Sequence, residues 1–367
     1  MLEKVSRSQT WFPCLALVGV LASCFGLVAP SFVRRYQLPF RSAVGIYGCF
    51  VLLLVIVILP GMRGTREWLE ERLVGSIRLA LIFIWCVPYL VYAAGTQDWR
   101  WSALVRILIV SAFLPLTYQF FPVFHLRRFC WQDFLVAVWL VGVLLSHQLA
   151  GIWNSPVNLD FMGRLFLIGV SSWNWVFVRK VPELGYRFSV SRKTIGAAAL
   201  NFALFAVIAI PSSLALRFTQ WNPLHISFLT FCLNYLEIFL FIALLEELFF
   251  RGFLQTLISY SLGSVRGGHL LVSCLFGLFH VMHPPFPNWR YVLLATLAGW
   301  FYGSAFMQSA KGAFALRHTM SHVHTSSGGT TETPPVIRVV FEPGNLMASS
   351  LTHAMVDTVW RTFFSRG

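Results

Sequence analysis

Long apolar runs recur along nearly the whole chain, and they restrict its fold more than any other feature. About eleven runs approach the ~20 helical residues that cross a bilayer core of ~30 Å. They lie near 11–29, 41–60, 77–94, 103–121, 134–152, 161–178, 195–216, 225–258, 269–282, 290–307 and 344–364. In lipid only helices and closed barrels satisfy the backbone, and no alternating strand pattern supports a barrel. We therefore predict an all-α polytopic transmembrane helix bundle of about eleven helices.

The composition agrees with a membrane protein and argues against a nucleic-acid-binding one. Hydrophobic residues make up 57% of the 367 residues and charged residues 11%, whereas an ordinary soluble domain has ~25% charged residues. The net charge is +14, but Lys and Arg lie in short clusters between the apolar runs. This pattern is typical of cytoplasmic loops beside anionic lipid. The expected partners are a lipid bilayer and a membrane-associated protein or peptide, with no nucleic acid.

The distribution of Lys and Arg between alternate loops also predicts the orientation. More of them fall on the side of the N-terminus, and the loop 179–193, "RKVPELGYRFSVSRK", lies on that side too. Because positive loops stay in the cytoplasm, we expect a cytoplasmic N-terminus. Short loops without an obvious organelle signal favour a bacterial inner membrane, and an endoplasmic-reticulum membrane is the alternative.

One segment interrupts the apolar pattern near the C-terminus. From about 308 to 342 the chain is rich in Ser, Thr, Gly, Pro and His, which is typical of an extramembrane loop. His318, His322 and His324 have a spacing that metal ligands can have, but no Cys and few carboxylates accompany them. We interpret this insert as a solvated loop. It falls within a predicted catalytic domain at 201–364, which follows N-terminal helices of unassigned role at 1–200.

Ionisable residues stand inside the apolar run "FLFIALLEELFFRGFLQTLI". Ionised groups in a bilayer cost a few kcal/mol each, so residues such as Glu246, Glu247 and Arg251 indicate function. At 100° per residue, Arg251 lies about 40° from Glu247 and about 140° from Glu246 on a helix. Glu247 and Arg251 can therefore pair, while Glu246 has no local cation. An unpaired carboxylate of this kind suits a general base.

Two further apolar runs carry histidines. His280 follows Phe276 by four residues in "SCLFGLFHVMH", so both side chains share a helical face. His353 and Asp357 have the same spacing in "MASSLTHAMVDTVW". Asp357 can accept a hydrogen bond from the imidazole of His353 and orient it.

Bringing these groups together in the bundle interior would offset the cost of burying each one. A single histidine of this kind is more often a satisfied core residue, but three helices with such groups favour a site. The cluster could activate a water and stabilise an oxyanion. The candidate catalytic residues are Glu246, Glu247, Arg251, His280, His353 and Asp357, all in the last four predicted helices.

These motifs, in this order, resemble the CAAX-protease and bacteriocin-processing family, also called the Abi family, over about 225–364. The matching elements are E-E-x-x-x-R-G from Glu246, F-x-x-x-H ending at His280, and H-x-x-x-D ending at Asp357, together with "LAGWFYG" at 297–303. The resemblance implies an intramembrane endopeptidase. It implies that Glu246 and His280 activate the hydrolytic water. The paired Glu and Arg suit proton chemistry without a metal, so we expect no cofactor.

The same resemblance implies that His353 and the residue at 357 stabilise the oxyanion, while Glu247 and Arg251 hold the site together. Two features depart from the family. Its prenyl-protein members generally carry Asn where this chain has Asp357, and an ionised Asp cannot donate to an oxyanion. Asp357 would then orient His353 or act in its protonated form. The insert at about 308–342 stands where the family usually has a short turn.

The predicted function is hydrolysis of a peptide bond in a membrane-proximal substrate such as a prenylated C-terminus, a leader or a sorting tail. The alternatives are a non-catalytic immunity or scaffold protein of the same fold, and a zinc-dependent membrane protease. Two His and several carboxylates could bind zinc, although the chain has no H-E-x-x-H. A transporter with a proton relay is less favoured, because no internal repeat is present.

Overall fold

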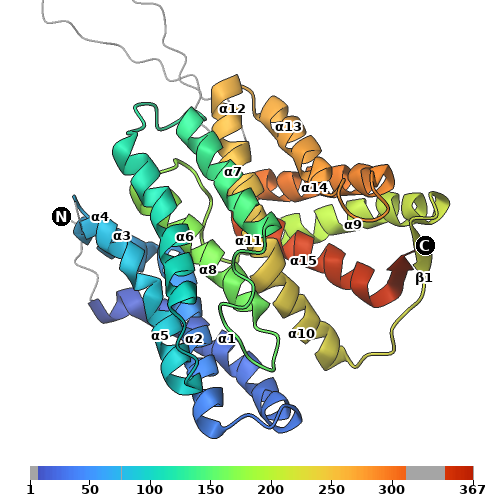
Figure 1. Cartoon of the computed structure of the whole chain (residues 1–367). Coiled ribbons are helices and arrows are strands. Elements are labelled where there is room, and N and C mark those ends of the chain that lie inside the picture. The colour runs from blue at the N-terminus through green and yellow to red at the C-terminus, as the bar shows by residue number, and fades with distance from the viewer. Residues whose placement is uncertain (1–6, 76, 311–343, 367) are drawn as a thin grey trace, which may run out of the picture.

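The computed structural model describes residues 7–75, 77–310 and 344–366, and almost all of them lie in helices or short connections. The first part of the chain forms helices that lie together on one side of the molecule in Figure 1. These are α1 (Arg7–Arg35), α2 (Phe40–Ile58), the 3-10 turn η1 (Leu59–Gly61), α3 (Arg63–Arg72), α4 (Ile77–Ile84), α5 (Cys86–Thr96), α6 (Trp101–Phe120), α7 (Trp131–Leu145), α8 (Asp160–Trp173) and the π-helical η2 (Asn174–Val178).

The second part of the chain gathers on the other side of that view, with α11 near the middle (Figure 1). Its helices are α9 (Arg192–Ala215), α10 (Phe228–Ile238), η3 (Phe239–Ala243), α11 (Leu244–Glu247), η4 (Leu248–Gln255), α12 (Thr256–Leu262), α13 (Val265–Leu278), α14 (Trp289–Gln308) and α15 (Leu346–Phe363). Two three-residue strands, β1 (Thr219–Trp221) and β2 (Phe364–Arg366), pair antiparallel. The helical bundle predicted from the apolar runs is confirmed.

Each predicted apolar run contains a helix, but fewer helices than expected have the length and hydropathy of a membrane span. Six do within the described residues: Trp11–Arg35, Phe40–Gly61, Trp101–Phe120, Asp160–Val178, Arg192–Ala215 and Phe228–Leu262. The run at 77–94 is divided between α4 and α5. Several polar side chains of α15 are buried, including those of Ser349, Ser350 and Thr352. The hydroxyls of Ser349 and Thr352 donate to backbone carbonyl oxygens of the preceding turn, so they can be buried without water.

Five helices of the second part of the chain start at a residue whose polar side chain caps the N-terminus. A side-chain oxygen at each N-cap accepts a hydrogen bond from a backbone N–H in the first turn, which satisfies a donor that the helix leaves open. The capping residues of α9, α10, α13, α14 and α15 are Ser191, Ser227, Ser264, Asn288 and Asn345. These caps fix where α13, α14 and α15 start, and α14 packs against both α13 and α15.

The run predicted to be too long for one straight span is a continuous helix from Phe228 to Leu262. At 1.5 Å per residue it measures ~52 Å, so it extends well beyond a ~30 Å hydrocarbon core. Its π-helical segments η3 and η4 flank the short α11, which contains Glu246 and Glu247. Such π segments inside α-helices are frequent at functional sites.

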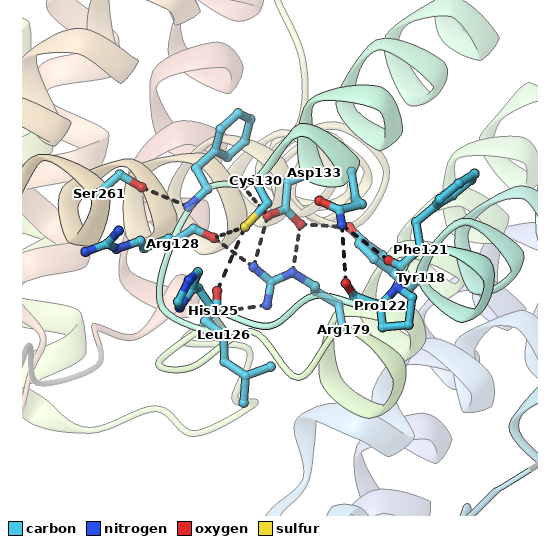
Figure 2. Close-up of polar contacts among 12 residues, drawn as sticks. Tyr118, Phe121, Pro122, His125, Leu126, Arg128, Cys130, Asp133, Arg179 and Ser261 are labelled. Atoms are coloured by element: carbon cyan, nitrogen blue, oxygen red, sulfur yellow. Dashed lines mark hydrogen bonds and ion pairs between the residues drawn. The ribbon is translucent and has the colours of Figure 1, made fainter.

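A buried ion pair holds the helices of the first part together (Figure 2). Arg179, just after η2, donates from Nε and Nη2 to the two carboxylate oxygens of Asp133 on α7, at 2.8 and 2.9 Å. Both side chains are fully buried. The hydroxyl of Tyr118 on α6 donates to Asp133 at 3.1 Å, and the N–H of Cys130 donates to it at 2.9 Å. The pair therefore joins α6, α7 and the end of η2.

The two parts of the chain are in direct contact. Helix α8 packs against η3 and α11. The indole of Trp175 on η2 stacks on the ring of Phe253 on η4, with centroids 4.3 Å apart and planes at 8°. The boundary near residue 200 remains a prediction, and α9 packs on α14 and α15. The contact places α8 and η2 beside the segment that carries Glu246.

Candidate active site

Glu247 lies at the centre of the polar cluster and is fully buried. Its Oε2 is 3.2 Å from Nε of Arg251, as the i, i+4 spacing predicts. Its Oε1 is 2.9 Å from Nδ1 of His353 on α15. A carboxylate only accepts hydrogen bonds, so this imidazole nitrogen carries the donated proton. Glu247 thus binds a cation on its own helix and a histidine on another helix.

Arg251 connects the helix of the two glutamates to α13 and α14. Its Nη2 donates to the carbonyl oxygen of Gly299 on α14 at 2.9 Å. Its guanidinium lies over the ring of Phe276 on α13 at 4.6 Å and over that of Tyr302 on α14 at 5.4 Å. A buried charge is tolerated when it is paired and hydrogen-bonded, and cation–π contacts add to this. Arg251 therefore contacts a carboxylate on its own helix, a backbone carbonyl on α14 and two aromatic rings on α13 and α14.

His353 is buried with its second nitrogen turned toward two more carboxylates. Its Nε2 is 3.5 Å from Oδ2 of Asp357 and 3.9 Å from Oε2 of Glu246. The predicted pairing of His353 with Asp357 is present in this geometry. The imidazole stacks on the ring of Tyr302 with centroids 4.4 Å apart and planes at 15°. Aromatic packing and the bond to Glu247 fix the orientation of the ring.

Glu246 differs from its neighbour in exposure and in partners. Its side chain is 35% exposed, whereas that of Glu247 is 0% exposed. It lines a cavity of about 200 Å³ together with His280. The division expected from helix geometry, with one glutamate paired and the other facing open space, is present in the structure. Glu246 is the carboxylate that a water or a substrate could reach.

His280 does not lie within a helix, and this corrects the prediction of a helical run at 269–282. Helix α13 ends at Leu278, and His280 lies in the turn that follows. Its Nδ1 is 2.9 Å from the carbonyl oxygen of Phe276. Because a carbonyl only accepts, Nδ1 carries the proton of the neutral ring and Nε2 is left as an acceptor. The ring packs beside Tyr291 and His283.

The structure brings together the six candidate residues on α11, η4, the turn after α13, and α15. Sequence reasoning missed the hydrogen bond between Glu247 and His353, since nothing in the sequence pairs these two residues. It also missed the stacking of Tyr302 on His353, although Tyr302 lies within "LAGWFYG". Glu237, on α10 of the same long helix, lies outside this cluster and pairs at the surface with Arg361 at 3.8 Å.

Among the described residues, no group of three or more His, Cys, Asp or Glu side chains is arranged to hold a metal ion. His318, His322 and His324 and most of the insert at about 308–342 lie outside the described residues. Zinc therefore stays an alternative to be tested in solution.

Comparison with protein families identifies one match. Residues 228–320 match the family model described as Type II CAAX prenyl endopeptidase Rce1-like. The match includes Glu246, Glu247, Arg251 and His280, and it confirms the resemblance drawn from the motifs. His353 and Asp357 lie beyond the matched residues and enter the site through the fold. A comparison of the chain with curated proteins and with solved structures found no match.

Proposed function

We propose that this chain is an intramembrane endopeptidase that uses a glutamate to activate water. The observation that carries the proposal is the different placement of two adjacent carboxylates. Glu247 is buried between Arg251 and His353, while Glu246 faces a cavity that it shares with His280. The family match over 228–320 supports a protease with a membrane-proximal peptide substrate.

In the proposed reaction, Glu246 accepts a proton from a water molecule in the cavity. His280 accepts a hydrogen bond from the same water through Nε2 and orients it. The water oxygen attacks the carbonyl carbon of the scissile peptide bond, and the carbonyl oxygen becomes an oxyanion. The oxyanion then re-forms a carbonyl as the C–N bond breaks, and Glu246 delivers its proton to the nitrogen of the departing amine. Glu246 is therefore the base in the first step and the acid in the second.

His353 is the proposed donor to the oxyanion. Its ring lies among the carboxylates of Glu246, Glu247 and Asp357, and we propose that it acts as the doubly protonated imidazolium. Nδ1–H then donates to Glu247, and Nε2–H is available to the substrate. A preorganised donor of this kind is worth about 10²–10³ in rate. Asp357 orients the ring from the solvent-accessible side.

The proposed substrates are peptides that lie close to the membrane, such as a prenylated C-terminus, a leader or a sorting tail. The six apolar helices support an integral membrane protein, so both enzyme and substrate would meet in the bilayer. The proposed location is a bacterial inner membrane with a cytoplasmic N-terminus, on the basis of the short loops and the Lys and Arg distribution.

The test compares the unmodified protein with Glu246→Gln, both purified in detergent. The probe is a library of peptides with an apolar membrane segment and a randomised adjacent stretch, and products are identified by mass spectrometry. Glu→Gln keeps the shape and removes the base, so cleavage should fall by about 10²–10⁴-fold. Glu237→Gln, at the surface, is the matched control and should cleave normally. Cleavage that survives Glu246→Gln would reject the mechanism, and a folded protein that cleaves nothing favours the non-catalytic reading.

A further inference from the structure

The cavity beside Glu246 has walls from both parts of the chain. One wall comes from the catalytic segment and the turn after α13, and the other from helices outside the residues that match the family model. Its volume is about 200 Å³. The lining residues are Leu140, Val141, Leu144, Leu167, Ser171, Trp175, Leu245, Glu246, Phe249, Phe250, Phe279, His280 and His283.

The two walls differ in chemistry. The wall from α7, α8 and η2 is apolar apart from one hydroxyl, and Leu140, Leu167 and Trp175 in it are each less than 5% exposed. Ser171 is also buried and is the smallest side chain of this wall. The opposite wall carries the candidate reacting groups Glu246 and His280. A peptide whose carbonyl lies at Glu246 would therefore direct a neighbouring side chain toward an apolar surface.

The mouth of the cavity lies on the apolar outer surface. Leu144 on α7 is 44% exposed, and Phe279, just after α13, is 45% exposed. Other exposed residues of α7, such as Phe134 and Val138, are apolar as well. Exposed apolar side chains are the composition of a lipid-facing surface. The exposed side of the cavity thus lies between α7 and the end of α13, on a surface whose composition suits contact with lipid.

The apolar wall is held rigidly against the catalytic helix. Trp175 stacks on Phe253 of η4, one helical turn away from Phe249 in the cavity. The buried pair of Arg179 and Asp133 fixes η2 to α7 just beyond Trp175 (Figure 2). A wall that is fixed in this way can discriminate by size, because packed interiors do not deform freely.

We propose that α7 and α8 form a specificity pocket for an apolar side chain of Leu or Phe size, on the substrate residue next to the scissile bond. The inference rests on the proposed function and adds the substrate preference. A dry apolar cavity of ~150 Å³ is large enough to bind benzene, so about 200 Å³ accommodates one such side chain beside the reacting groups. The substrate peptide enters from the bilayer past Leu144 and Phe279. Leu140 and Ser171 set the size of the pocket.

Two substitutions of opposite effect test the pocket. Ser171→Leu reduces its volume and Leu140→Ala enlarges it, while Val138→Ala, exposed on α7 and outside this cavity, is the control. Each variant is purified in detergent, checked for cooperative thermal unfolding, and given the same randomised peptide library. Relative cleavage of peptides with Phe and with Ala at the residue next to the cut is the readout.

We expect Ser171→Leu to lower the Phe-to-Ala cleavage ratio by about tenfold or more, which is the scale of discrimination by one apolar group. Leu140→Ala should shift the preference toward larger side chains, and Val138→Ala should leave the ratio unchanged. An unchanged ratio in both pocket variants, with cleavage still dependent on Glu246, would overturn the pocket and leave the proposed function intact. The same peptides are also tested with a farnesyl or a geranylgeranyl group on a neighbouring cysteine, and cleavage that follows only the length of the isoprenoid would assign the cavity to a lipid chain and also overturn the pocket.

A cross-linking measurement tests the pocket without catalysis. Leu144→benzoylphenylalanine places a photoreactive group at the mouth, and Val138→benzoylphenylalanine places it on α7 away from the cavity. Both are combined with Glu246→Gln and irradiated with the same peptide library. Preferential cross-linking of Phe- or Leu-containing peptides at position 144 supports the pocket. Equal cross-linking at both positions, without side-chain preference, contradicts it even if no cleavage is ever observed.

Discussion

Nδ1 of His353 lies 2.9 Å from Oε1 of Glu247, and this bond joins two helices that are far apart in the chain. The same carboxylate lies against Arg251, so one buried group holds both a cation and an imidazole. The bond also decides which way His353 faces. With Nδ1 used for Glu247, Nε2 points to Glu246 and Asp357, where a substrate oxygen could lie.

Replacing Glu247 by Gln should destabilise the protein more than the same change at Glu246. Glu247→Gln leaves the buried guanidinium of Arg251 without its counter-charge, and breaking a buried ion pair in this way costs about 3–5 kcal/mol. Glu246→Gln removes a partly exposed carboxylate and should have a much smaller effect on stability. Thermal unfolding of both variants in the same detergent is the measurement. Equal losses of stability would show that Arg251 does not depend on Glu247.

Asp357 should tolerate Asn but not Leu. The amide of Asn can still contact Nε2 of His353 and can also donate to an oxyanion, which an ionised Asp cannot do. Asp357→Asn should therefore keep cleavage within about tenfold of the unmodified protein, because its contacts are preserved. Asp357→Leu should lower it by about 10²-fold, since the orienting contact is lost. The measurement is the initial rate of cleavage of one identified peptide by each variant. A Leu variant as active as the unmodified protein would show that Asp357 has no role in catalysis.

The helical fold and the separation of the two glutamates could be predicted because both follow from local rules. Apolar run length indicates the spans, and the 100° advance per residue puts Arg251 beside Glu247 and leaves Glu246 on another face. The pairing of His353 with Asp357 follows from the same i, i+4 geometry. In each case the relevant residues are close in sequence, so no knowledge of the tertiary structure is required.

The remaining features depend on contacts between distant segments. No periodicity pairs Glu247 with His353, and none places Trp175 against Phe253. The sequence predicts that His280 lies within a helix. In the structure α13 ends two residues before His280, ahead of the Pro-rich turn. Asp133 and Arg179 could have been noticed as charges at the ends of apolar runs. Their pairing, however, is set by how α7 and η2 pack (Figure 2).

A chelator should not change the activity. The proposed chemistry moves protons between water, Glu246 and the leaving amine, and no step uses a metal. Cleavage after treatment with a strong chelator, followed by buffer exchange, should match the untreated protein within error. Loss of cleavage that zinc restores would instead establish the zinc-dependent alternative. Metal analysis of the purified protein by mass spectrometry provides an independent check.

Gly277 should not tolerate even Ala, whereas Gly142 should. A Cβ at Gly277 would lie 1.9 Å from Oγ1 of Thr296 and 2.6 Å from the carbonyl oxygen of Val292, so α13 and α14 would have to separate. Overpacking of this kind costs about 1–3 kcal/mol. Nothing lies within 4 Å of a Cβ at Gly142, and Ala in an open helical position is favoured by up to about 1 kcal/mol.

The same pair of variants separates packing from activity. Gly277 is three residues before His280, so displacing the end of α13 should also move the imidazole. We expect Gly277→Ala to lower both the thermal unfolding temperature and the cleavage rate, and Gly142→Ala to lower neither. Thermal scans and initial rates in one detergent are sufficient. A Gly277→Ala protein of normal stability would show that the contact between α13 and α14 can relax.

The ion pair of Asp133 and Arg179 should show strong coupling in a double-mutant cycle. Asp133→Leu leaves Arg179 buried without a counter-ion, and Arg179→Met leaves Asp133 with only Tyr118 and the Cys130 N–H. Each single change should cost about 3–5 kcal/mol, because an uncompensated charge remains. The double variant removes both charges and should be more stable than the sum of the single changes by about 0.5–3 kcal/mol. Reversible unfolding in detergent supplies the free energies, and strictly additive values would contradict the coupling.

The single variants should also weaken the size preference of the cavity, since Trp175, which lines the cavity, lies four residues before Arg179.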